Sequence, residues 1–114
     1  MYQARYDDIM NDGADEAKER ERSLFDQSII LLEAARDESG YSYKGVEAVY
    51  FTSRLWMIVI EDLGSPANGL PQQLRASLIS IGLFILRELE AIRQETSRDY
   101  DSIIDITKTI RDGL

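Results

Sequence analysis

An apolar stripe between Leu74 and Ile92 constrains the fold of this chain more than any other feature. Its members are spaced by four, three, four, four and three residues: Leu74, Leu78, Ile81, Ile85, Leu89 and Ile92. This spacing places them on one face of an α-helix, in which side chains repeat every 3.6 residues. Pro71 marks the start, because its missing N–H has no helical partner at the first position of a helix. We therefore predict a helix that has Pro71 at its first position and continues over 72–96.

The middle of this helix, "LISIGLFIL" from Leu78 to Leu86, is apolar nearly all round. Such a segment is a buried element, a membrane span, or the floor of a groove that holds a partner. It has about half of the roughly 20 apolar residues that a membrane span needs, and Arg75 and Arg87 flank it. Gly82 predicts a close crossing by another helix, since a mid-helix glycine is otherwise unfavourable by roughly 1 kcal/mol. We expect one side of the segment to be core and the other to meet a partner or a second copy of the chain.

Turn residues divide the rest of the chain into further helical blocks. The turn signals lie at Asn11–Gly13, Glu38–Gly45 and Gly64–Pro71. The blocks between and beyond them span 14–37, 46–63 and 98–114, each with apolar residues at helical spacing. The predicted fold is all-α: a single domain over 1–114, built as a small bundle of about four helices with the long third helix at its centre.

The charge balance is acidic, with 21 Asp and Glu against 13 Lys and Arg. Nonspecific nucleic-acid binding draws its affinity from Lys and Arg beside phosphates, so direct RNA or DNA binding is disfavoured. An anionic membrane surface is disfavoured for the same reason. The first 23 residues have no apolar segment of the kind found in signal peptides. We expect a cytoplasmic protein.

The residue types that carry most enzyme chemistry are missing. The chain has no histidine and no cysteine, which removes the commonest general base, nucleophilic thiols and the usual zinc ligands. A partial match to a calcium-binding loop places Asp8, Asp12, Gly13 and Glu19 at ligand or turn positions, but Met10 occupies a position that needs an oxygen ligand. We expect no enzymatic activity, no metal and no cofactor.

The central part of the sequence resembles the FlaF family of flagellar biosynthesis proteins of alphaproteobacteria. The resemblance rests on "RLW" at 54–56, "EDL" at 61–63 and "NGLPQQLRASLISIGL" at 68–83. The segments "MYQ", "EAKERERS", "LLEAA" and "IDITKTIRDGL" extend it to both ends of the chain. The loop "DESGYSYKG" is the variable part.

The resemblance implies a cytoplasmic chaperone or regulator that binds flagellin and is needed for its synthesis and secretion into the filament. It also implies a partner, the translational regulator FlbT, through which the protein would act if it does not bind flagellin itself. Flagellin's terminal segments form helices, which an apolar groove on a small helical domain can hold. A homodimer is the third possibility, with the surplus apolar surface buried between two copies.

The candidate partner-binding residues lie in the second and third predicted helices, where apolar side chains exceed one stripe: Phe51, Arg54, Leu55, Trp56, Ile58, Arg75, Ile79, Leu83 and Phe84. Trp56 is either a core residue whose indole N–H meets a carbonyl or an anchor for the partner. Arg54 and Arg75 are either surface ion-pair partners or contacts to the client. Residues 68–71 are expected to fix a loop geometry.

Overall fold

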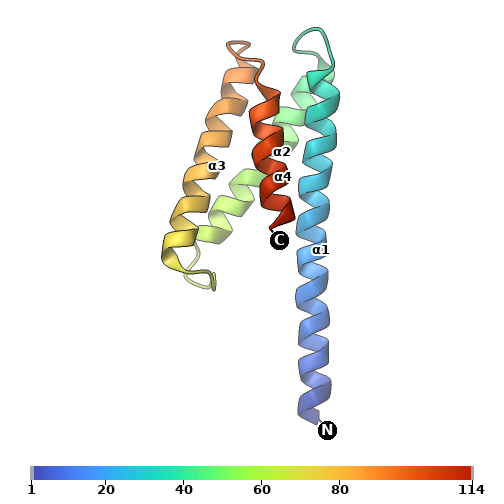
Figure 1. Ribbon diagram of the computed structural model, residues 1–114, viewed down its shortest axis with the longest axis vertical. Helices are drawn as coiled ribbons and strands as arrows, with labels where there is room; N and C mark the ends of the chain where they lie inside the picture. Colours follow the sequence, from blue (N-terminus) through green and yellow to red (C-terminus); the bar gives the residue numbers. More distant parts are fainter. Residues whose placement is uncertain (1, 114) are drawn as a thin grey trace.

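Helices account for the fold in the computed structural model (Figure 1), which describes the backbone of residues 2–113 and the side chains of residue 13 and residues 15–113. They are α1 (Tyr2–Arg36), α2 (Tyr43–Gly64), α3 (Gln72–Arg93) and α4 (Tyr100–Asp112), and the described residues contain no β-strand. The all-α prediction is confirmed.

Several helix boundaries differ from the sequence prediction, most of them by up to three residues, and two differences matter for the fold. The turn expected at Asn11–Gly13 is wrong, because α1 continues through these residues. Helix propensity is a weak prior, and a few unfavourable residues within a 35-residue helix do not outweigh those around them. Pro71 lies one position earlier than predicted: it is the N-cap of α3, with the extended ψ of 143°.

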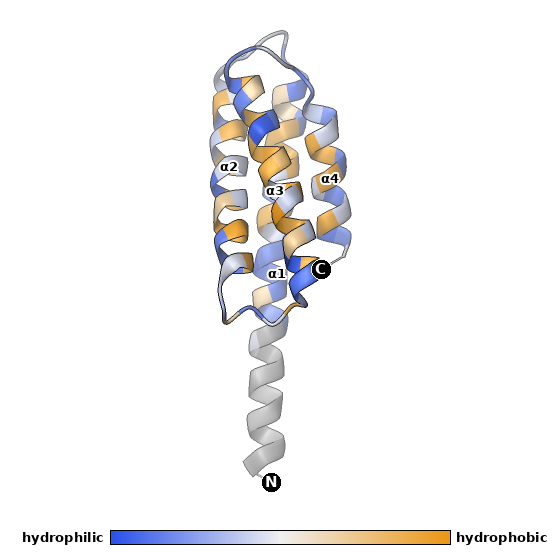
Figure 2. Ribbon diagram, turned by 90° about the vertical axis from the view of Figure 1, so that its left-hand side faces the viewer, coloured by the Kyte–Doolittle hydropathy of each residue, from blue (hydrophilic) through white to orange (hydrophobic). Residues whose placement is uncertain are grey.

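The core is built from the inward faces of all four helices. Its members are Phe25, Ile29, Leu32 and Ala35 of α1, Ala48, Val49, Leu55 and Trp56 of α2, Ile85, Leu89 and Ile92 of α3, and Tyr100, Ile103 and Ile104 of α4. The Phe25 and Trp56 rings meet edge to face, with centroids 5.9 Å apart. Figure 2 shows α2 and α4 on either side of α3, with α1 behind.

Gly82 is where α2 and α3 approach each other closely, as predicted. A Cβ atom at this position would lie 2.9 Å from the Ile60 side chain and 2.9 Å from Cε3 of the Trp56 ring. Because real Cβ atoms do not approach other heavy atoms so closely, only glycine fits without a shift of its neighbours. Gly82 therefore fixes the position along α2 at which α3 packs against it.

The third helix is not at the centre of the bundle, contrary to the prediction. It packs mainly on α2 and makes only a small contact with α4, whereas α1 packs on both α2 and α4. In the described part of the chain α1 and α3 are not neighbours, so they lie diagonally opposite. Four helices that each bury one face against a shared core have no central member, and the surplus apolar residues of α3 face outward instead.

Polar contacts join the first and last helices. Arg36 pairs with Asp101 at 2.9 Å near one end of α4, and Arg111 pairs with Asp26 at 2.9 Å near the other. A buried hydrogen bond of 2.8 Å between the hydroxyls of Ser28 and Thr52 joins α1 to α2. Among the described residues, no helix has both the length and the apolar character that crossing a bilayer requires.

Candidate functional site

A cleft of about 520 Å³ opens at the end of the bundle where α2 connects to α3. We call it the end cleft. All four helices and the α2–α3 connection contribute to its lining. Its apolar residues are Phe25, Trp56, Val59, Leu63, Leu70, Leu74, Leu78 and Ile110, and its remaining residues are Lys18, Glu21, Asp62, Asn68, Thr109 and Gly113.

The end cleft follows from the different lengths of α3 and α4. At a rise of 1.5 Å per residue, the 22 residues of α3 span about 33 Å and the 13 residues of α4 about 20 Å. The two helices are joined by a short connection at the opposite end of the bundle, so α4 stops before it reaches the first turns of α3 (Figure 1). Those turns therefore have no α4 residue to cover them.

The burial of the predicted α3 stripe changes along the helix, because α4 does not cover its first turns. Ile85, Leu89 and Ile92 are buried at the end where α4 lies alongside, and Leu78 is only half-buried. Leu74, in the first turns, is 45% exposed. The stripe thus packs against the core from Ile81 onward, and its first two members, Leu74 and Leu78, line the cleft.

Trp56 contributes to the lining at the inner side of the end cleft. The residue is only 1% exposed, which makes it a core residue, one of the two roles that the sequence left open. The carbonyl expected for its indole N–H is absent: Nε1 is buried and has no hydrogen-bond partner among the described residues. A buried donor without an acceptor is unfavourable by about 1–3 kcal/mol.

The mouth of the end cleft has an acidic balance. Its ionisable residues are Lys18, Glu21 and Asp62. The C-terminal ends of α2 and α4 lie at this end of the bundle together with the N-terminal end of α3, so their dipoles partly cancel and the side chains set the balance. An occupant with basic residues along its polar margin complements this mouth.

The connection between α2 and α3 has a fixed geometry, as predicted for residues 68–71. The Asn68 side chain accepts a bond from the Leu70 N–H at 3.0 Å and donates one to Asp62 at 3.2 Å. Arg75 donates to the carbonyls of Leu70 and Leu63 at 3.1 and 3.3 Å. Arg75 therefore braces the end of α2 against the start of α3, a role that neither sequence alternative described.

The other predicted partner-binding residues do not share one surface. On α2, Leu55 is buried, Phe51 is half-buried against the core, and the exposed Arg54 lies over the Tyr50 ring at 5.7 Å. Ile58 is exposed and lies two positions from both Trp56 and Ile60, which face Gly82, so it points away from α3.

On α3, Leu83 and Phe84 are exposed and Ile79 is half-buried. The residues that sequence reasoning missed are Leu74, Leu78 and Ile110, because apolar residues at helical spacing indicate a buried face. The final helical block, 98–114, is shorter than the third, 72–96, and this difference was the available signal that part of the third helix would stay uncovered.

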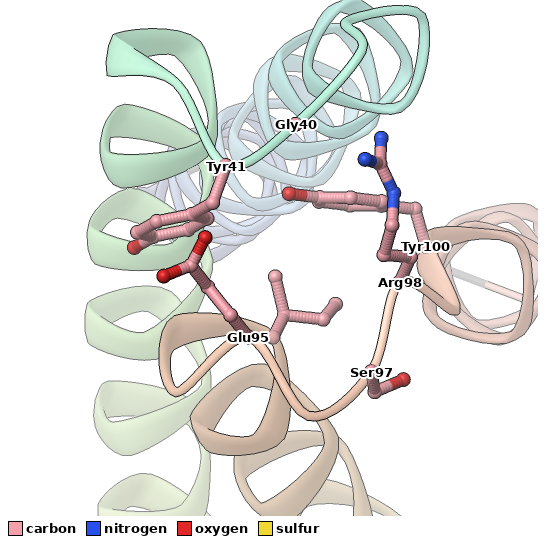
Figure 3. Close-up of a pocket in the computed structure, with 7 residues that line it drawn as sticks. Gly40, Tyr41, Glu95, Ser97, Arg98 and Tyr100 are labelled. Carbon is pink, nitrogen blue, oxygen red and sulfur yellow. The ribbon is translucent and has the colours of Figure 1, made fainter.

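A smaller cavity of about 130 Å³ lies at the opposite end of the bundle, between the α1–α2 and α3–α4 connections (Figure 3). Tyr41 and Tyr100 line it, and burial raises the pKa of both hydroxyls. Arg98 donates to the Glu38 carbonyl at 2.7 Å, which ties the two connections together. This cavity is small, and its polar groups serve the connections themselves.

The partial calcium-loop match does not form a loop. The backbone from Asp8 to Glu19 is helical throughout, and the side chains of Asp8 and Asp12 lie outside the described residues. No cluster of three or more potential ligands occurs among the side chains that the structure describes.

Comparison with known proteins gives one family. A family model described as flagellar protein FlaF matches residues 2–114. No curated protein and no solved structure matches the chain.

Proposed function

The chain belongs to the FlaF family of flagellar proteins, and on that premise we propose that it is a cytoplasmic chaperone and regulator that binds flagellin before export. In this proposal the end cleft receives one of the helix-forming terminal segments of flagellin. The observation that carries the proposal is the uncovered first half of the α3 stripe, which leaves Leu74 and Leu78 beside a cleft lined by all four helices.

An amphipathic helix suits the end cleft because it would continue the packing that α4 begins. Such a helix lays apolar residues at i, i+3, i+4 and i+7 into a groove between helices. Leu70, Leu74, Leu78 and Ile110 supply apolar contacts along the cleft. Fully burying an exposed leucine is worth roughly 1.5–3 kcal/mol, so the burial of apolar side chains on both partners supplies the driving force for the proposed binding.

A protein that holds flagellin before export can in this proposal affect both the synthesis and the export of flagellin. A flagellin chain whose terminal helix is held in the cleft cannot assemble prematurely. The alternative partner is the FlbT-type regulator, in which case the same cleft would serve control of flagellin translation without contact to flagellin.

The test is a calorimetric titration of the purified protein with flagellin, with a FlbT-type protein titrated in parallel. We expect micromolar or tighter binding to flagellin, with a negative heat-capacity change from apolar burial. Binding to the FlbT-type protein alone would contradict the flagellin proposal and favour the alternative.

Two matched variants locate the binding surface. Leu74→Asp places a charge in the end cleft at a residue that is 45% exposed, so folding tolerates it. Ile58→Asp makes the same kind of change on a face of α2 that points away from α3. We expect Leu74→Asp to weaken flagellin binding at least tenfold and Ile58→Asp to leave it unchanged, while circular dichroism reports native helix content for both. Equal binding by wild type and Leu74→Asp would exclude the end cleft.

A further inference from the structure

The outer face of α2 has a second, largely apolar stripe, and only its last residue, Ile60, contacts α3. Tyr43, Val46, Tyr50, Ser53, Met57 and Ile60 are spaced alternately by three and four residues. We call this stripe the α2 seam. It has the heptad spacing by which one helix packs along another.

Most of the α2 seam is exposed to solvent. Tyr43 is 80% exposed, Tyr50 64% and Met57 52%. The buried residues of α2, among them Ala48 and Thr52, lie on a different face. Scattered exposed apolar residues are ordinary, but a continuous seam of them marks an interaction surface.

The neighbouring surface of α3 widens this face. Gly82 rests against Ile60, the last residue of the α2 seam, so Leu83 lies at the level of that end of the seam. Leu83 is 49% exposed and, together with Leu86, Arg87 and Glu90, lines a shallow hollow on the outside of α3. A helix packed on the α2 seam would have Leu83 at its side.

The pattern of the α2 seam is complementary to itself in the antiparallel direction. We propose that a second copy of the chain occupies it, with the two α2 helices packed antiparallel. In that register Tyr43 faces Ile60 of the second copy, Val46 faces Met57 of the second copy, and Tyr50 faces Ser53 of the second copy. Every residue of the seam then meets another residue of the seam, as an interface with twofold symmetry requires.

The charges beside the α2 seam favour the same arrangement. Glu47 and Arg54 are exposed and flank Tyr50 on the side away from the core. The antiparallel register places Glu47 two residues, or about 3 Å along the helix axis, from the level of Arg54 of the second copy, which is close enough for an ion pair, and the twofold symmetry repeats this pair. A parallel register would set Glu47 level with Glu47 and Arg54 level with Arg54. The antiparallel helix dipoles also attract each other.

This interface does not involve the end cleft, so the dimer leaves the cleft open to a client. It therefore does not depend on the proposed function, and the two can fail separately. The Ser53 layer is the weakest of the seam, because it sets a small polar side chain against Tyr50.

The first test is the mass of the protein in solution by sedimentation equilibrium at tens of micromolar. We expect twice the chain mass of 13.0 kDa. Met57→Asp should give the monomer mass with native circular dichroism, and Ser53→Leu should raise the association constant about tenfold by adding apolar contact to the weakest layer. A wild-type monomer at high micromolar concentration would overturn the proposal.

Charge variants test the register without removing apolar surface. Glu47→Arg should weaken association, because the introduced guanidinium would lie near Arg54 of the second copy. Combining Glu47→Arg with Arg54→Glu should restore the association. A double variant as weak as Glu47→Arg alone would overturn the antiparallel pairing.

Disulfide trapping gives the direction of the helices, since the chain has no cysteine of its own. Val46→Cys and Met57→Cys variants are oxidised separately and as a mixture. We expect the disulfide-linked dimer chiefly in the mixture, where the two introduced thiols face each other. Dimers that form equally well from each variant alone would contradict the antiparallel arrangement.

Discussion

At the scale of single residues, Gly82 is a position where close packing limits the residue type to glycine. A side chain there would meet the Trp56 ring and Ile60 at 2.9 Å. The sequence predicted this close approach because a mid-helix glycine needs a compensating contact. It could not identify the contacting residues, since these depend on how α2 and α3 pack.

We predict that Gly82→Ala destabilises the protein by about 1–3 kcal/mol, because overpacking at the helix crossing exceeds the gain in helix propensity. Gly13→Ala is the matched control, since Gly13 also lies within a helix but a Cβ added there would have no neighbouring atom within 4 Å. That variant should be neutral or stabilising by up to roughly 1 kcal/mol. Urea unfolding of the two variants measures both effects, and a stabilised Gly82→Ala would refute the close packing.

Glu95 ends α3 in a conformation that usually belongs to glycine. Its φ is 61°, in the left-handed region, and it is the first residue past the C-cap Gln94. The N–H of Glu95 bonds to the Ile92 carbonyl at 3.0 Å and that of Thr96 to the Ala91 carbonyl at 2.9 Å. These two bonds close the helix as in the Schellman motif.

Glu95→Gly should therefore stabilise the protein, by about 0.5–1 kcal/mol, because glycine adopts this φ without a Cβ penalty. Gln94→Gly serves as the control: its φ of −82° suits any residue, so the change should be neutral or destabilising. Thermal unfolding monitored by circular dichroism compares the stabilities of the two variants. A loss of stability in Glu95→Gly would show that the glutamate makes a compensating contact.

At the scale of elements, α4 is the helix whose start is most clearly defined by side-chain chemistry. Asp99 is its N-cap and accepts bonds from the Ser102 N–H at 3.1 Å and from the Ser102 hydroxyl at 2.6 Å. The bonds from Ser102 lower the pKa of the Asp99 carboxyl. Because the pKa is lowered in the folded state, the cap stabilises the fold above the ordinary aspartate range and loses this effect as the pH falls.

We predict that Asp99→Ala costs about 1 kcal/mol at neutral pH, as the loss of a side-chain N-cap does. Asp99→Asn keeps a capping oxygen that does not titrate. The stability of wild type relative to Asp99→Asn should therefore decrease as the pH is lowered below about 4, where an aspartate begins to take up its proton. A difference that stays constant between about pH 7 and pH 2 would contradict the assigned cap.

The elements themselves were largely predictable, and the errors have physical causes. The stripe of α3 and the turn around Pro71 gave the right helix with a boundary error of about one to three residues. The break expected at Asn11–Gly13 failed because propensity alone does not stop a helix. The exposed half of the α3 stripe was missed because spacing reports which residues share a face, and not whether another helix is long enough to cover it.

At the scale of the whole molecule, the arrangement of the helices separates two surfaces that the sequence could not distinguish. The end cleft exists because α4 is shorter than α3, and the α2 seam exists because α2 has apolar residues on two faces. The predicted partner residues were drawn from both helices as one patch. The structure assigns Leu55 and Trp56 to the core and separates Ile58 from Leu83 and Phe84.

The central claim is that the end cleft binds flagellin, and Trp56 offers the most direct measurement of it. The chain has one tryptophan, so a protein labelled with ¹⁵N gives a single indole N–H resonance in a heteronuclear NMR spectrum. Trp56 lines the cleft, and its indole N–H lacks an acceptor among the described residues. We predict that saturation with unlabelled flagellin, or with a peptide of its terminal helix, moves this resonance to a new position, and that the change is lost in Leu74→Asp. An indole resonance that stays in place while calorimetry reports saturated binding would mean that flagellin binds elsewhere on the protein.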